Sequence, residues 1–249
     1  MPRIWRKVLH IYLISGGDVD PLIPGKKMLA IFGFCDIRNF TDATEVLQEQ
    51  VMVFVNEIAD IVHSTVDNLN GSANKNIGDA FLLVWKFPEE DIFIDKQNLI
   101  LSDRHVPKQI ADMSVLAFIK IVASIKLSRA IEKYNKHEGL NERLPGYQVK
   151  MGFGLHWGWA IEGAIGSVYK IDASYLSPNV NMASRLEAAT KQFGVPILIS
   201  GELYSICTKE VQKHLRLIDK VTVKGSTQPL GKYFGLTYLR TIHSGFRFD

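Results

Sequence analysis

The sequence predicts an α+β fold in which helices flank a mixed, ferredoxin-like sheet. Three observations support this class. Short apolar runs of strand length alternate with longer segments whose apolar residues recur at helical spacing. The resulting order of elements, βα-ββ-α-ββ-αβ-ββ, fits helices packed on a mixed sheet. The chain has 249 residues, 47% of them hydrophobic, which is enough to bury the core of one large domain.

The chain is expected to begin with an appended segment, residues 1–25. Residues 3–14 carry apolar side chains at helical spacing, and the Gly/Pro-rich stretch SGGDVDPLIPGKK follows them as a linker. We expect residues 26–240 to form the folded domain and residues 241–249 to form a C-terminal tail.

The domain is expected to open with an apolar strand at residues 28–35, MLAIFGFC. Asp42 followed by Glu45 resembles a capping box, which predicts the start of a helix. Apolar residues at helical spacing continue from there, so we expect this helix to run to about residue 69.

Two further strands are predicted at residues 72–77 and 80–85, meeting at Gly78-Asp79. The segment 87–111 is polar and bounded by prolines, which predicts a surface insertion. The rest of the chain predicts, in order, a helix at about 112–137, strands within 147–166, a helix at about 178–193, a short strand at 196–200 and two closing strands at about 215–238.

Charge and cysteine content exclude several classes of function. The 29 basic and 26 acidic residues leave a net charge of +3 without a Lys/Arg-rich run, which argues against nucleic-acid binding. The two cysteines lack metal-binding spacing, so a reducing, cytoplasmic location is expected. No apolar run is long enough to predict a membrane span. The alternative of a cytosolic domain within a larger membrane-anchored protein stays open.

Two aspartates stand at the ends of predicted core strands. Asp79 lies at the mouth of the apolar run in NKNIGDAFLLVW, and Asp36 ends the first strand in FGFCDIRNFTD. Burying a carboxylate is costly unless its charge is compensated. If the two strands lie side by side, both carboxylates can reach one Mg²⁺ ion, and the amides of IRNFTD can bind a polyphosphate. The residues alone leave this interpretation open beside a simpler one, in which the aspartates are independent turn caps.

Four segments, in order, resemble the signature blocks of class III nucleotidyl cyclases: FCDIRNFT, KNIGDAFL, GFGLHWGWAIEGAIG and NVNMASRLEAA. The match runs from about residue 28 to 238 and is most similar to cyclases of unicellular eukaryotes. The resemblance implies the class III cyclase fold and a homodimer with composite sites at its interface. Each site would join the metal and phosphate half of one domain to the base-reading half of the other.

The resemblance assigns Asp36 and Asp79 to two metal ions, Mg²⁺ or Mn²⁺, with the Ile37 carbonyl as a further ligand. Lys75 matches the residue that reads the purine edge, and Ser174 stands where the partner of that residue is expected. Taken singly, Lys75 is better explained as a solvated turn lysine. The joint spacing of the motifs is what favours the functional interpretation.

Asn181 matches the asparagine that orients the ribose, and Arg185 matches the arginine that stabilises charge on the reacting phosphate. Lys224 corresponds to a lysine that contacts the terminal phosphates, while the amides at Phe40 and Thr41 belong to the helix start that would hold the polyphosphate. Considered alone, Arg185 is better explained as an ordinary exposed helix residue, and only the joint spacing of the motifs favours the functional role.

Two positions depart from the family pattern. Ser177 replaces a usual glycine ahead of Pro178, which predicts a differently shaped turn. Pro196 stands where mammalian heterodimeric enzymes carry a phosphate-binding arginine, so Lys224 and the amides of residues 37–41 are expected to hold the triphosphate without it.

The expected activity is that of an adenylyl cyclase, which converts ATP to 3′,5′-cyclic AMP and pyrophosphate. Lys75 has only donors and suits adenine N1, while the Ser174 hydroxyl can accept from the 6-amino group. Guanine N1 is a donor and calls for a carboxylate at position 75, but a serine can also donate to the guanine carbonyl. Guanylyl cyclase is therefore one alternative, and a catalytically silent, dimerising domain is another. Against the silent domain, Asn181 and Arg185 occur in the same chain as both metal aspartates.

Overall fold

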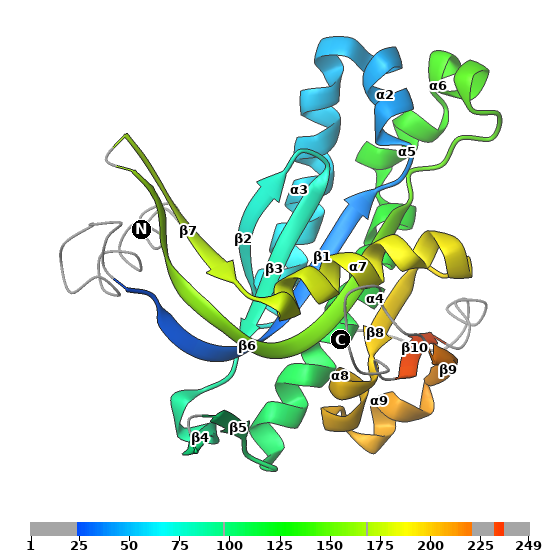
Figure 1. Cartoon of the computed structure of the whole chain (residues 1–249). Helices are drawn as coiled ribbons and strands as arrows, with labels where there is room; N and C mark the ends of the chain where they lie inside the picture. Colours follow the sequence, from blue (N-terminus) through cyan, green and yellow to red (C-terminus); the bar gives the residue numbers. More distant parts are fainter. Residues whose placement is uncertain (1–23, 97, 168, 221–231, 237–249) are drawn as a thin grey trace.

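The computed structural model describes residues 24–96, 98–167, 169–220 and 232–236. Its centre is a mixed sheet whose strands run in the order β2-β3-β1-β6-β8-β10-β9, with β7 paired to β6 (Figure 1). The strands are β1 (Lys26–Ile37), β2 (Ser72–Ile77), β3 (Ala80–Lys86), β6 (Met151–Ser167), β7 (Lys170–Leu176), β8 (Ile197–Ser200), β9 (Leu215–Lys220) and β10 (Lys232–Leu236).

Strand β1 is central and is antiparallel to both of its neighbours, β3 and β6. Its last residues include Asp36, which lies opposite Ala80 on β3 and Gly152 on β6. Strand β8 joins β6 in parallel, so the sheet is mixed. The predicted α+β class, with a ferredoxin-like sheet flanked by helices, is confirmed.

Alternate side chains of β1 enter two cores because successive residues of a strand face opposite sides of a sheet. Ile31 and Cys35 belong to the larger core, and Ala30 and Phe32 belong to a smaller one on the other face. The larger core is covered by α3 (Val51–Asn68) and α4 (His105–Leu127), and α7 (Pro178–Phe193) packs against β6 and β1 over the smaller one (Figure 1). The connecting helices are α2 (Phe40–Leu47), α5 (Arg129–Asn135), α6 (Glu138–Arg143), α8 (Gly201–Ile206) and α9 (Lys209–Lys213).

The turn between β2 and β3 forms at Gly78-Asp79, as predicted. Gly78 has a φ of 62°, a left-handed conformation that glycine adopts without a steric cost. The chain pairs Ile77 with Ala80 immediately on either side of this turn. The tight turn therefore places Asp79 at one end of the strands, directly before the buried strand β3.

Helix α4 begins at His105 rather than near residue 112, so the end of the predicted insertion 87–111 belongs to a helix. The rest of that segment forms a 3-10 turn and a separate hairpin, made of β4 (Ile92–Asp95) and β5 (Asn98–Leu101). The predicted long helix is also interrupted. Ser128 is extended and its side chain caps α5 by accepting from the Ile131 amide, which ends α4 and starts a new helix.

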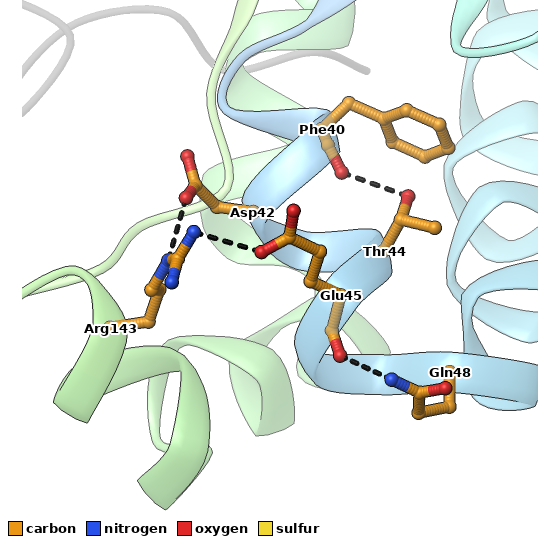
Figure 2. Close-up of polar contacts among 6 residues, drawn as sticks. All are labelled: Phe40, Asp42, Thr44, Glu45, Gln48 and Arg143. Atoms are coloured by element: carbon orange, nitrogen blue, oxygen red, sulfur yellow. Dashed lines mark hydrogen bonds and ion pairs between the residues drawn. The ribbon is translucent and has the colours of Figure 1, made fainter.

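The predicted capping box at Asp42 and Glu45 is wrong. Helix α2 starts after Asn39, whose backbone has a left-handed conformation and whose side chain makes no capping hydrogen bond. Asp42 and Glu45 instead accept from one arginine of α6, Arg143, whose Nε and Nη2 atoms each lie 2.8 Å from a carboxylate oxygen (Figure 2). The predicted helix is also divided, because a 3-10 turn at residues 48–50 separates α2 from α3.

Some predicted features lie outside the described residues, namely the helix at 3–14, the tail at 241–249 and Lys224. The two closing strands are present as β9 and β10. In the part of the chain that the structure describes, no helix combines the length and apolar character needed to cross a bilayer.

Candidate active site

Asp36 and Asp79 come together where β1 ends and β3 begins. The amide of Ile37 donates to the Asp79 carbonyl at 3.3 Å, which ties the two strand ends together. Burial raises the pKa of Asp36, and the neighbouring Asp79 carboxylate raises it further, while Lys191 and Arg38 act in the opposite direction. The aspartates thus form a crowded pair of like charges that the nearby cations offset only in part.

A divalent cation fits this pair. Within the described ranges no group of three or more His, Cys, Asp and Glu side chains could hold a metal ion by itself. Mg²⁺, however, commonly uses only one or two carboxylates and completes its shell with phosphate oxygens and water. A cation would also remove the repulsion that raises the pKa of Asp36. The Ile37 carbonyl stays a predicted further ligand.

The two predicted base-reading residues are in contact. The Nζ atom of Lys75 on β2 donates to the Oγ atom of Ser174 on β7 at 3.1 Å. A second bond joins the same strands, because the Asn74 side chain donates to the Ala173 carbonyl at 3.1 Å. The long β6–β7 hairpin curves across the sheet and brings β7 beside β2 (Figure 1). Ser174 is buried, whereas Lys75 is exposed. The exposed ammonium group therefore contacts a hydroxyl that the fold holds in place.

Asn181 and Arg185 lie four residues apart on α7 and are both exposed, so they share one face of the helix. Ser177 caps the N-terminus of α7, since its side chain accepts from the Asn179 amide at 2.9 Å, and Pro178 follows at the first helical position. The φ of Ser177 is −172°, an extended conformation open to any residue. Replacement of the family glycine by serine therefore imposes no backbone strain.

The opposite face of α7 meets Asp36 through Arg38. The Nη1 atom of Arg38 lies 2.7 Å from Glu187 and 3.9 Å from Asp36, and its Nη2 atom donates to the Thr190 hydroxyl. Residues two positions apart on a helix point about 200° apart. Because Glu187 faces Asp36, Arg185 faces away from the Asp36 carboxylate of its own chain.

Sequence reasoning missed the role of Arg38 and Glu187. Arg38 lies inside the motif FCDIRNFT, and Glu187 lies inside NVNMASRLEAA, so both were in view. No local spacing relates the two residues, since Arg38 lies in the turn directly after β1 and Glu187 lies on α7. The sequence offers no signal for this pair, because the burial of Glu187 is visible only in the folded structure.

The N-terminal end of α7 is held by a buried histidine, His156, on β6. Its Nε2 atom lies 3.1 Å from the Asn179 side-chain oxygen, and its Nδ1 atom lies 2.8 Å from the Ser200 hydroxyl. The Asn179 amide nitrogen donates to the Trp159 carbonyl, so its oxygen faces the imidazole and Nε2 carries the proton. Burial lowers the pKa of His156.

The chain belongs to the adenylate and guanylate cyclase catalytic domain family, whose model matches residues 26–237. The adenylate cyclase of Anabaena cylindrica is 27% identical over 203 residues, which is 80% of this chain and 35% of that protein. The terminal-differentiation specific adenylate cyclase of Dictyostelium discoideum is 28% identical over 212 residues, or 83% of this chain and 8% of that protein. This chain therefore spans only a part of each of these relatives.

A solved structure shows the same fold. The structure of a bacterial light-regulated adenylyl cyclase superposes with a TM-score of 0.67 at 23% sequence identity, covering 94% of this chain and 60% of that one. The match of the family model over residues 26–237 confirms the family expected from the four sequence blocks.

Proposed function

We propose that this chain is the catalytic domain of an adenylyl cyclase, which converts ATP to 3′,5′-cyclic AMP and pyrophosphate with Mg²⁺ or Mn²⁺. The observation that carries the choice of ATP is the contact between Lys75 and Ser174. An ammonium donor beside a hydroxyl that can accept is complementary to adenine, which presents an acceptor at N1 and a donor at its 6-amino group. Family membership supports the reaction type.

A homodimer with composite sites is supported by the faces of α7. Arg185 points away from the side of the helix on which Glu187 approaches Asp36, so it is poorly placed to act with the aspartates of its own chain. A second copy would supply the missing half. The β6–β7 hairpin also exposes large apolar side chains that a partner could cover, namely Trp159, Ile165, Tyr169 and Leu176.

The proposed reaction is an intramolecular displacement, in which the ribose 3′-hydroxyl attacks the α-phosphate and pyrophosphate leaves. Two bound cations, held by Asp36 and Asp79, would lower the pKa of the hydroxyl and neutralise the triphosphate. Asn181 would orient the ribose. Arg185 would present two parallel donors to the charge that develops on the phosphate, a geometry that lysine does not reproduce. Because both reacting groups belong to one molecule, positioning supplies much of the rate acceleration.

The triphosphate is proposed to bind at the start of α2. The first amides of a helix have no partner within it, so those of Phe40 and Thr41 are suited to phosphate oxygens. Two carboxylates in the same helix, Asp42 and Glu45, would repel a polyphosphate. Arg143 pairs with both of them and offsets that repulsion (Figure 2).

Incubation of the purified protein with ATP or GTP, each with Mg²⁺ or Mn²⁺, tests the proposal directly. We expect cyclic AMP as the main product. The Arg185→Lys variant keeps the positive charge but loses the two parallel donors of the guanidinium, so its rate of cyclic AMP formation should be strongly reduced. Cyclic GMP as the main product would instead favour a guanylyl cyclase. No cyclic product from a folded dimer under any of the four conditions would contradict the assigned activity and favour the silent domain.

Mixed dimers test whether the site is composite. Asp79→Ala and Arg185→Ala homodimers should each be nearly inactive, whereas a mixed dimer carries both lesions in one site and leaves the other intact. Random exchange of equal amounts of the two variants should therefore restore up to about a quarter of the parental activity for a two-fold symmetric dimer. If an independent label demonstrates exchange and no activity returns, each site lies within one chain.

A further inference from the structure

On the basis of the function proposed above, we infer that Arg38 is a positioning residue. Within each subunit it links the part that serves one active site of the dimer to the part that serves the other. In a composite arrangement, Asp36 of one chain serves one site, while Arg185 of the same chain serves the other. Arg38 touches both halves, since its guanidinium lies beside Asp36 and also binds the buried face of α7, the helix that carries Arg185. It would therefore hold the metal carboxylate and the catalytic helix in one fixed relation.

Arg38 contacts both helix α7 and the segment that leads into β6. Its guanidinium binds Glu187 at 2.7 Å and also contacts Thr190, so two residues on successive turns of α7 are held. Its backbone amide donates to the Lys150 carbonyl at 2.9 Å, which fixes the end of β1 against the segment that leads into β6. The side chains of Arg38 and Glu187 are only 16% and 7% exposed, so water screens their attraction weakly.

Gly152 provides the space that the guanidinium occupies. This residue lies opposite Asp36 on β6. A methyl group built on it would overlap the Nη2 and Cζ atoms of Arg38 and the Oε1 atom of Glu187. The absence of a side chain at position 152 is therefore a second, independent sign that the fold is arranged around this ion pair.

A buried ion pair contributes little net stability, because desolvation of both charges offsets their attraction. Stability alone is therefore a weak reason to bury Arg38 beside a metal aspartate. Positioning is a better one, because residues that orient metal ligands commonly control metal affinity. Lysine would not substitute, since a single ammonium cannot reproduce the separate contacts that the planar fork makes with Glu187 and Thr190.

The test must separate positioning from charge. Removing Arg38 alone deletes a positive charge near Asp36, which would favour a cation even if the carboxylate were misplaced. The double variant Arg38→Met/Glu187→Met deletes one charge of each sign and keeps the apolar volume. Replacing a buried pair in this way is often neutral for stability. The matched control is Lys133→Met/Glu57→Met, which removes a different ion pair of 2.6 Å between α5 and α3.

Mn²⁺ affinity can be measured without turnover by electron paramagnetic resonance of free Mn²⁺ in the presence of 3′-deoxy-ATP, which lacks the attacking hydroxyl. We expect the Arg38→Met/Glu187→Met variant to melt close to the parental temperature but to bind Mn²⁺ about tenfold more weakly. The Lys133→Met/Glu57→Met control should keep the parental affinity. Parental Mn²⁺ affinity in the Arg38→Met/Glu187→Met variant would overturn the inference.

The joining of two sites is tested in the mixed dimer of Asp79→Ala and Arg185→Ala, which has one intact site. Placed in the subunit that supplies Asp36 to this site, the Arg38→Met/Glu187→Met pair should raise the KM for Mn²⁺. Placed in the subunit that supplies Arg185, it should lower kcat and leave that KM unchanged. A response from only one placement, or from neither, would contradict a residue that serves both sites.

Failure of the proposed function would be visible separately. A parental protein that neither binds Mn²⁺ with 3′-deoxy-ATP nor forms a cyclic nucleotide would overturn the proposed activity, and the role of Arg38 with it. A parental protein that does both, beside an Arg38→Met/Glu187→Met variant with unchanged Mn²⁺ affinity and kcat, would overturn the role of Arg38 alone.

Discussion

Substitution of Gly152 by alanine should displace the Arg38 guanidinium and destabilise the protein. The new methyl group would occupy the position of Nη2, and it would also meet the carboxylate of Glu187. Gly152 itself lies in the regular pairing of β1 with β6, so the backbone there has little freedom to move away. The side chain of Arg38 must leave instead, and Glu187 then stays buried without its partner.

The expected cost follows from the burial of the pair. Removing one partner from a buried ion pair typically costs about 3–5 kcal/mol. Because the Arg38 side chain is 16% exposed and can turn toward water rather than vanish, we expect the lower end, about 3 kcal/mol. For a chain of this size, each kcal/mol lowers the melting temperature by about 2–4 °C, so the loss should be roughly 6–12 °C.

Equilibrium urea denaturation at a fixed protein concentration measures this cost, and a double-mutant cycle identifies its origin. In the background Arg38→Ala/Glu187→Ala the methyl group has room, so Gly152→Ala should then cost less than about 1 kcal/mol. The control is Gly163→Ala on the same strand, where a new methyl group would come within 3.1 Å of the Gly25 Cα atom, so that this backbone must shift by only a few tenths of an ångström. We expect that variant to lose less stability than Gly152→Ala and to lose the same amount in both backgrounds.

An equal cost of Gly152→Ala in both backgrounds would refute the reasoning, because the penalty would then come from the backbone rather than from the displaced ion pair. A loss below about 1 kcal/mol in the parental background would refute it as well, since the pair would have found another arrangement at little cost.

Three further predictions concern the site. Asp36→Ala should abolish cyclic-nucleotide formation yet leave the melting temperature within a few degrees of the parent, because it removes a metal ligand and relieves like-charge crowding; near-parental turnover at saturating Mn²⁺ would contradict the metal site. Lys75→Glu combined with Ser174→Cys should shift the ratio of kcat/KM from ATP toward GTP, since a carboxylate accepts from guanine N1; an unchanged ratio would mean that these residues do not read the base. The free energy of unfolding should fall as the pH drops below about 6.5, because the folded protein holds His156 at a lowered pKa while the unfolded chain binds the proton freely. His156→Gln should flatten that slope below about pH 6.5, and an unchanged slope would assign it to other groups.

Local patterns in the sequence determined the main elements and the places of several site residues. The continuous apolar run of β1 and the Gly78-Asp79 turn are short-range features, so the ends of β1 and β3, and with them Asp36 and Asp79, could be located from neighbouring residues alone. The spacing of Asn181 and Arg185 likewise follows from helical periodicity. The assignment of roles to these residues came from the resemblance of four sequence blocks to a family.

Tertiary structure decided which distant residues meet. The bond between Lys75 and Ser174 joins positions 99 apart and depends on the curvature of the β6–β7 hairpin. The predicted capping box was wrong for the same reason, because Asp42 pairs with Arg143, which lies 101 positions further along the chain.

The contacts of the Arg38 side chain depend on the tertiary structure even more strongly. Its partner Glu187 comes from α7, and the space for its guanidinium comes from Gly152 on β6. Helix and strand patterns reflect interactions among residues a few positions apart, whereas the register of a sheet and the packing of a helix on it set contacts between residues that no local pattern relates.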